Sequence, residues 1–131
     1  MFGLTVNDRF LLYGEPCDMR KSFDGLSGLV TEHLGGNPRS GEVFVFINKR
    51  RDRIKLLAWQ GSGFTLYYKR LESGTFELPH YDLAAGGIRL DYAQTVLLVD
   101  GLSLQNLQRR ARYDAPQVVE ISPTKPALAS L

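Results

Sequence analysis

Five of the sixteen basic residues lie within the seven positions 49–55, which makes this segment the best candidate for binding a partner. Residues 48–70 contain seven Lys or Arg and one acid, a net charge of +6, whereas the whole chain carries +2. The remaining residues therefore sum to −4, so the positive charge is localised. A localised basic surface on a small domain attracts polyanions, and arginine suits two-point contacts with phosphates or guanine edges.

We expect this segment to contact nucleic acid from the tip of a hairpin. The candidate contact residues are Lys49, Arg50, Arg51, Arg53 and Lys55, with Lys69, Arg70, Arg20 and Lys21 as a second patch. The alternative is a solvated tip whose charges keep the loop soluble, and the charge pattern alone favours neither interpretation. Tyr67, Tyr68 and Trp59 could stack on bases, although core packing is the more common role for a Trp.

Patterns for catalysis or metal binding are weak in this sequence. Cys17, His33 and His80 supply its thiol and imidazole groups, and no two of them are closely spaced, so we expect no zinc site and no cofactor. Cys17 with one histidine would make a nucleophilic pair, but a buried structural thiol is the favoured interpretation. The predicted strands carry almost no internal acids, which a two-metal nuclease would need. We therefore predict a protein that is not an enzyme.

Apolar periodicity predicts the elements that position the basic segment. Five strands are expected, over residues 9–13, 43–47, 54–59, 64–69 and near 75–78. The last four should form an antiparallel meander, because consecutive strands joined by short turns pair as neighbours. The loop 48–52 is then a hairpin tip. A helix is expected over 19–34 with Asp18 as its N-cap, because apolar residues recur there at steps of three and four.

The predicted fold class is α+β, with this helix packed on one face of the meander. The other face also carries bulky residues, and three covers are open: a helix over 91–99 beginning at Asp91, the N-terminal strand, or a partner. Residues 104–112 could form a last short helix. We expect one domain over residues 1–112 and an extended or disordered Pro-containing tail over 113–131.

Composition places the chain among ordinary soluble domains. Its 131 residues are 44% hydrophobic and 23% charged, and no apolar run approaches the roughly 20 residues of a membrane helix. The N-terminus lacks the pattern of a secretory signal, and a single cysteine allows no internal disulfide. We therefore expect a cytoplasmic protein with no membrane partner. A homo-oligomer formed through exposed strands remains open.

The residues of the predicted helix and hairpin also resemble a known family. Residues 17–26, CDMRKSFDGL, resemble the TDMRKSFDGL signature of the TnpB accessory proteins of the insertion-sequence-66 family. Residues 41–46 and 49–57, GEVFVF and KRRDRIKLL, resemble the central block of that family. Trp59, Gly61, Gly63-Phe64 and the segments 68–72 and 74–76 continue the likeness in order, which covers about residues 5–105. Cys17 departs from the Thr that is usual in the family.

The resemblance implies a small non-catalytic protein that is encoded beside a separate transposase and assists transposition of the element. It is not the RNA-guided nuclease that shares the TnpB label. In that context we expect a DNA-binding accessory factor that contacts element ends through the basic hairpin. The alternative is an adaptor that docks on the transposase without touching DNA, and it predicts that an uncovered aromatic face of the sheet is the contact surface.

Overall fold

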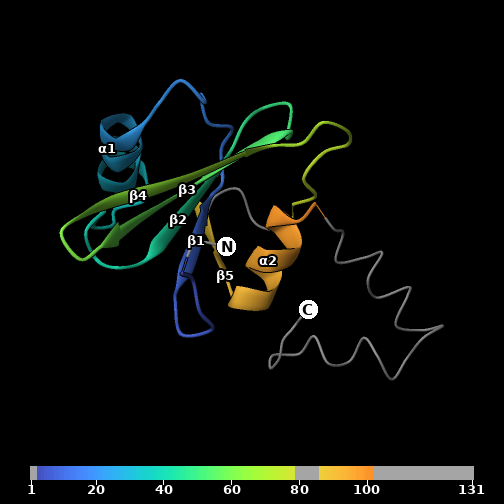
Figure 1. The fold of residues 1–131 in the computed structure, drawn as a ribbon. Coiled ribbons are helices and arrows are strands. Elements are labelled where there is room, and N and C mark those ends of the chain that lie inside the picture. Colours follow the sequence, from blue (N-terminus) through green and yellow to red (C-terminus); the bar gives the residue numbers. More distant parts are fainter. Residues whose placement is uncertain (1–2, 79–85, 102–131) are drawn as a thin grey trace.

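The computed structural model describes residues 3–78 and 86–101, which form one sheet with a helix on each face (Figure 1). The elements in chain order are β1 (Phe10–Tyr13), α1 (Phe23–His33), β2 (Val43–Ile47), β3 (Arg53–Gln60), β4 (Gly63–Arg70), β5 (Gly87–Leu90) and α2 (Tyr92–Val99). The predicted α+β class is confirmed. The expected helix over 104–112 and the tail over 113–131 lie outside the described residues. None of the helices in the described ranges is long and apolar enough to cross a membrane.

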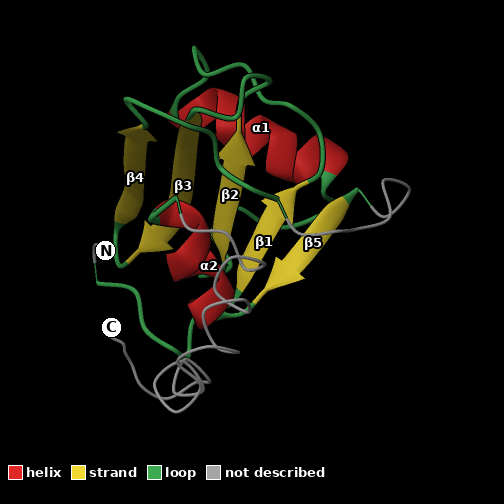
Figure 2. Cartoon of the chain, turned by 90° about the vertical axis from the view of Figure 1, so that its right-hand side faces the viewer, coloured by secondary structure: helices red, strands yellow, loops and turns green. Residues whose placement is uncertain are grey.

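The five strands are arranged in the order β4-β3-β2-β1-β5 (Figure 2). The three strands β2, β3 and β4 form an antiparallel meander as predicted. The turn between β3 and β4 begins at Gly61, whose φ of 68° is a conformation that glycine adopts freely. On its other side β2 pairs in parallel with β1, so α1 is the crossover between them, and β5 pairs antiparallel with β1. The sheet is therefore mixed.

The apolar side chains of the sheet alternate between two cores. The core beneath α1 contains Cys17, Leu26, Val30, Phe44, Phe46 and Leu57. The core beneath α2 includes Val43, Val45, Leu56, Phe76, Leu98 and Val99. All five residues of β2 are buried, as expected for a central strand covered on both faces. Of the three covers left open by the sequence, α2 is the one that packs on the second face.

The segment 75–78 was expected to be a strand, and that prediction is wrong. Phe76 is fully buried, and its backbone N–H donates to the carbonyl of Arg51 over 2.6 Å. The pattern of apolar residues therefore marked a buried segment correctly. It lacks the repeated backbone pairing that defines a strand, and the fifth strand is instead β5, which was not expected from the sequence.

The helix starts also differ in how well they were predicted. α1 begins at Phe23, later than expected, and its N-cap is Ser22. Asp18 does not cap it, because its carboxylate accepts hydrogen bonds from the backbone and side chain of Arg20 in a local turn. Asp91, in contrast, caps α2 as predicted: its side chain accepts from the Gln94 N–H, and the Gln94 side chain accepts from the Asp91 N–H.

Candidate nucleic-acid interface

The hairpin tip between β2 and β3, residues 48–52, is shaped by the side chain of Asn48. Its amide oxygen accepts from the backbone N–H groups of Asp52 and Arg53, each over 3.0 Å. Its amide nitrogen donates to the Asp52 carboxylate over 2.7 Å. One side chain thus ties both ends of the loop together. These three hydrogen bonds hold the backbone of the basic residues between Asn48 and Arg53 in one conformation.

Arg51 lies at the turning point of this loop and has φ of 61°, a left-handed conformation that non-glycine residues seldom adopt. The segment after β4 holds the loop from the other side: the N–H of Leu71 donates to the Asp52 carbonyl over 2.8 Å, and the N–H of Phe76 to the Arg51 carbonyl. An unfavourable backbone conformation persists where surrounding contacts determine it. The basic loop is therefore a braced structure.

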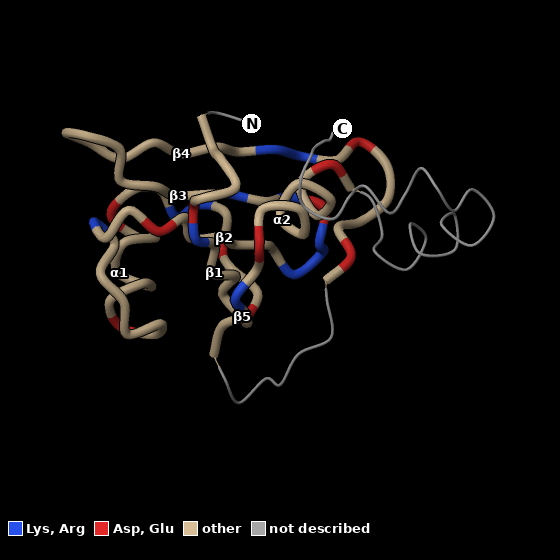
Figure 3. Tube along the Cα trace, turned by 90° about the horizontal axis from the view of Figure 1, so that it is seen from below, with Lys and Arg blue, Asp and Glu red and all other residues tan. Residues whose placement is uncertain are grey.

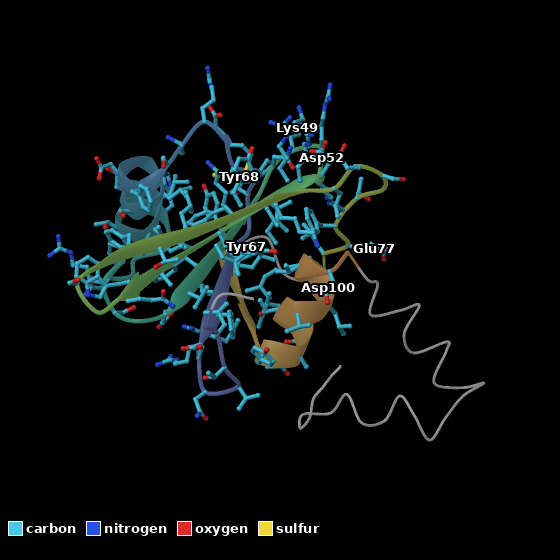
Figure 4. The ribbon with its side chains drawn as sticks, in the orientation of Figure 1. Lys49, Asp52, Tyr67, Tyr68, Glu77 and Asp100 are labelled. Carbon is cyan, nitrogen blue, oxygen red and sulfur yellow. The ribbon has the colours of Figure 1, made fainter. Side chains whose placement is uncertain are left out.

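The cations of this loop are open to solvent. Lys49, Arg50 and Arg51 are exposed and Arg53 is half-buried. Within residues 3–78 and 86–101, none of these four side chains forms an ion pair. The neighbouring acid, Asp52, is occupied by Asn48, and this hydrogen bond lowers the pKa of its carboxyl group, with smaller contributions from nearby arginines. We call Lys49, Arg50, Arg51 and Arg53 the loop cations (Figure 4 labels Lys49 and Asp52).

The segment before α1 lies beside this loop, as the hydrogen bond from the Cys17 N–H to the Ile47 carbonyl, 2.9 Å, requires. Together they form an open hollow of about 370 Å³, lined by Cys17, Asp18, Met19, Arg20, Asn48, Lys49, Arg50 and Arg53. Arg20 thus joins the loop cations in space. The Asp18 carboxylate balances the charge of Arg20 at 2.7 Å. The hydrogen bonds that Asp18 accepts from the side chain and backbone of Arg20 lower the pKa of Asp18 to about 2. Lys21 is exposed and lies two residues before α1 begins.

Lys55 is the clearest correction to the predicted contact set. It is only 5% exposed, and its Nζ donates to the carbonyls of Met19 and Lys21 over 2.8 and 2.7 Å. Its ammonium also lies 4.5 Å from the centre of the Tyr68 ring. A buried ammonium with these partners cannot reach a phosphate. Lys55 anchors the chain before α1 onto the sheet, and we exclude it from the proposed contact surface.

Lys69 and Arg70 were expected to form one patch, but they lie on opposite faces of β4. Lys69 points toward α2, where its Nζ donates to the Val99 carbonyl over 2.8 Å. Arg70 lies directly opposite Arg53 on the neighbouring strand β3. With Tyr68 and Glu72, these two residues line a second hollow of about 310 Å³. In Figure 4, Tyr68 and Lys49 lie on one side of the β4 ribbon and Tyr67 lies on the other.

The cross-strand position of Arg70 was missed, although the sequence contains the signal for it. The pair Gln60↔Gly63 flanks the tight turn, so the register counts outward to Arg53↔Arg70 without a break. Treating the two basic groups as separate patches overlooked this symmetry. Arg53 and Arg70 lie side by side where β3 begins and β4 ends, whereas Lys69 faces α2, and Figure 3 shows the basic stretch at the end of β4.

Two of the three thiol and imidazole groups, Cys17 and His33, lie within the described residues. Cys17 is buried, and burial raises the pKa of its thiol to about 11, so it stays protonated near neutral pH. The ring of His33 lies beside Tyr13, with 6.2 Å between their centres, and His80 falls outside the described residues. Among the side chains that the structure describes, no group of three or more His, Cys, Asp or Glu is arranged to hold a metal ion.

Comparisons with known proteins agree with the resemblance carried by the helix and hairpin motifs. The chain is 36% identical to uncharacterized protein y4jC of Sinorhizobium fredii over 110 residues, which are 84% of this chain and 92% of that protein. It is 34% identical to uncharacterized protein y4hO of the same organism over 95 residues, 72% of this chain and 81% of that protein. No solved structure matches significantly. The model of the family described as IS66 Orf2-like protein matches residues 8–109, so this chain belongs to the IS66 Orf2-like family.

Proposed function

We propose that this chain is a non-catalytic accessory protein for transposition of an IS66-type element and that it binds DNA through the loop cations. Family membership supports the transposition context. The observation that supports DNA binding is the set of four cations, free of ion pairs within the described ranges, on a loop braced by Asn48 and by the segment after β4. A loop that is already ordered loses little conformational freedom on binding a phosphate backbone.

The braced loop also bears on the alternative of a solvated hairpin tip. Charges that serve solubility alone do not require a fixed backbone, and a flexible tip would serve equally well. Here Arg51 is held in a left-handed conformation, which costs about 1–2 kcal/mol for a residue other than glycine. Such a cost at the centre of a basic cluster favours a binding role for the loop.

The transposase adaptor is the second candidate function, and most of the sheet surface on which it was based is covered in the described part of the chain. That hypothesis required an uncovered aromatic face, whereas α1 and α2 pack on the two faces of the sheet. Among the described residues, the large hydrophobic side chains that remain exposed are Val6, Phe23 and Tyr68. A docking site for the transposase would therefore use these few side chains or another part of the surface.

The test is a charge-removal variant assayed for both partners. Replacing Arg50, Arg51 and Arg53 with Ala should weaken binding to element-end DNA at least about tenfold at moderate salt. The variant neutralises fewer phosphates, so its binding releases fewer counterions from the DNA. Binding to the transposase, measured in parallel by pull-down, should be unchanged. If transposase binding is lost and DNA binding is retained, the adaptor function replaces our proposal.

A matched control removes the same charge from elsewhere. Arg9 and Arg89 pair with Glu42 immediately before β2, at the opposite end of that strand from the basic loop, and the Arg39 guanidinium lies over the Trp59 ring. Replacing Arg9, Arg39 and Arg89 with Ala changes the net charge by the same amount. This variant should retain DNA binding within about threefold. The three arginines would attract DNA only over a long range, and salt screens that attraction. An equal loss in both variants would show that net charge alone attracts the DNA.

A further inference from the structure

Tyr68 is an exposed aromatic residue within the basic surface, and its ring is supported from one side. The residue is 50% exposed. One face of the ring lies on the Lys55 ammonium, which is itself held by the carbonyls of Met19 and Lys21. The exposed part of the ring is therefore its other face and its edge. A ring fixed in this way offers a flat surface for stacking without first losing rotational freedom.

Two arginines lie beside this ring in an arrangement that is unfavourable without a ligand. The register places Arg53 directly opposite Arg70 and Lys55 directly opposite Tyr68. Like charges directly opposite one another destabilise an antiparallel pair. Arg70 is partly compensated by Glu72 at 3.0 Å, but this ion pair is solvent-exposed, and such pairs contribute little. A phosphate between the two guanidinium groups would remove the repulsion.

We propose that this hollow binds an unpaired nucleotide of DNA, with Arg53 and Arg70 on its phosphate and Tyr68 stacked on its base. The inference rests on the proposed DNA-binding function and specifies the form of DNA. Bases inside a closed duplex are stacked on their neighbours and cannot reach the ring, whereas an unpaired base can. Arg53 also lines the hollow of the basic loop, so the strand continues from Tyr68 toward Lys49 and Arg50.

The test compares single-stranded and duplex DNA of one sequence by fluorescence anisotropy with the full chain. We expect the single strand to bind at least about fivefold more tightly than the duplex. Tyr68→Ala should weaken binding of the single strand about tenfold or more, because stacking on an aromatic ring is lost. Tyr68→Phe keeps the ring and should bind within about twofold of the original, and duplex binding should change less than about twofold in both variants.

A second variant and a second signal separate stacking from a structural effect of Tyr68. Tyr68→Leu keeps an apolar side chain over Lys55 but removes the aromatic face, so it should lose single-strand affinity while its melting temperature stays close to that of Tyr68→Phe. Trp59→Leu removes an aromatic residue near the other end of β3 and should leave binding unchanged. An oligonucleotide containing 2-aminopurine should be quenched by stacking in the Phe variant and not in the Leu variant.

Glu72 gives a variant with the opposite expectation. Glu72→Gln frees Arg70 from its ion partner and removes a carboxylate from the hollow, so single-strand binding should tighten about two- to fivefold. If duplex DNA binds as tightly as the single strand and no Tyr68 variant alters either affinity, the nucleotide site is refuted while the proposed DNA binding stands. If neither form of DNA binds, both proposals fail.

Discussion

Asn48 determines the shape of the basic loop, although it carries no charge. Its amide group makes three hydrogen bonds that close the loop on Asp52 and Arg53. The charged residues therefore project from a frame that they do not build. The sequence indicated the cluster of cations, but it did not indicate this frame, because nothing in the spacing shows which way an amide side chain turns.

At Arg51, the charge and the backbone conformation can be separated by two substitutions. Arg51→Gly and Arg51→Ala remove the same charge, but glycine accepts the φ of 61° without strain. We expect the Gly variant to be more stable than the Ala variant by about 1 kcal/mol in denaturant unfolding. Both should weaken DNA binding equally. Equal stability of the two variants would contradict the left-handed conformation at this position.

The single thiol provides a prediction that depends on pH. Burial raises the pKa of Cys17 to about 11 from an ordinary value of 9.0, so the reactive thiolate is scarcer in the folded protein at every pH below about 9. At pH 8 the native thiol should react with a disulfide reagent at least about 100-fold more slowly than the thiol of the denatured chain. Rapid labelling of the native protein at pH 8 would show that Cys17 is accessible and more acidic than this.

At the scale of the elements, β3 and β4 bring together basic residues that lie far apart in the sequence. The meander was predictable because its strands are apolar runs separated by glycine-containing or charged turns. β5 was not, because Gly87, Ile88, Arg89 and Leu90 carry little strand signal and become a strand through pairing with β1. The parallel pairing of β1 with β2 is likewise a non-local property, which no local pattern specifies.

Lys55 shows why alternation along β3 was insufficient to identify contact residues. Period-two spacing placed Arg53 and Lys55 on the same face, and the structure confirms this. It could not reveal that the chain before α1 folds over Lys55 and leaves Arg53 beside the open hollows. The position at which a neighbouring segment ends on a sheet face depends on tertiary packing, so burial at that boundary required the structure.

The anchoring role of Lys55 can be tested by Lys55→Met, which retains most of the side-chain length. The substitution leaves the Met19 and Lys21 carbonyls without their donor, and we expect a loss of about 1–3 kcal/mol in the free energy of unfolding. The salt dependence of duplex binding should remain unchanged, because this ammonium does not contact phosphate. A shallower salt slope with unaltered stability would return Lys55 to the contact surface.

At the scale of the whole molecule, the arginines paired with Glu42 and the loop cations lie at opposite ends of the sheet. Glu42, immediately before β2, gathers Arg9 and Arg89 into ion pairs at one end. The loop cations occupy the other end and have no such partner among the described residues. The localised excess of positive charge was visible in the sequence. Only the structure shows that this excess lies at one end of a sheet whose two faces are covered by helices.

The most direct test of DNA binding through the loop cations is the affinity for duplex DNA across a range of salt concentrations. If four cations displace counterions, the logarithm of the association constant should fall against the logarithm of the salt concentration with a slope of about −4. Replacing Arg50, Arg51 and Arg53 with Ala should make the slope shallower by about 3. A slope near zero, or the same slope in the original protein and the variant, would show that the loop cations do not bind DNA phosphates.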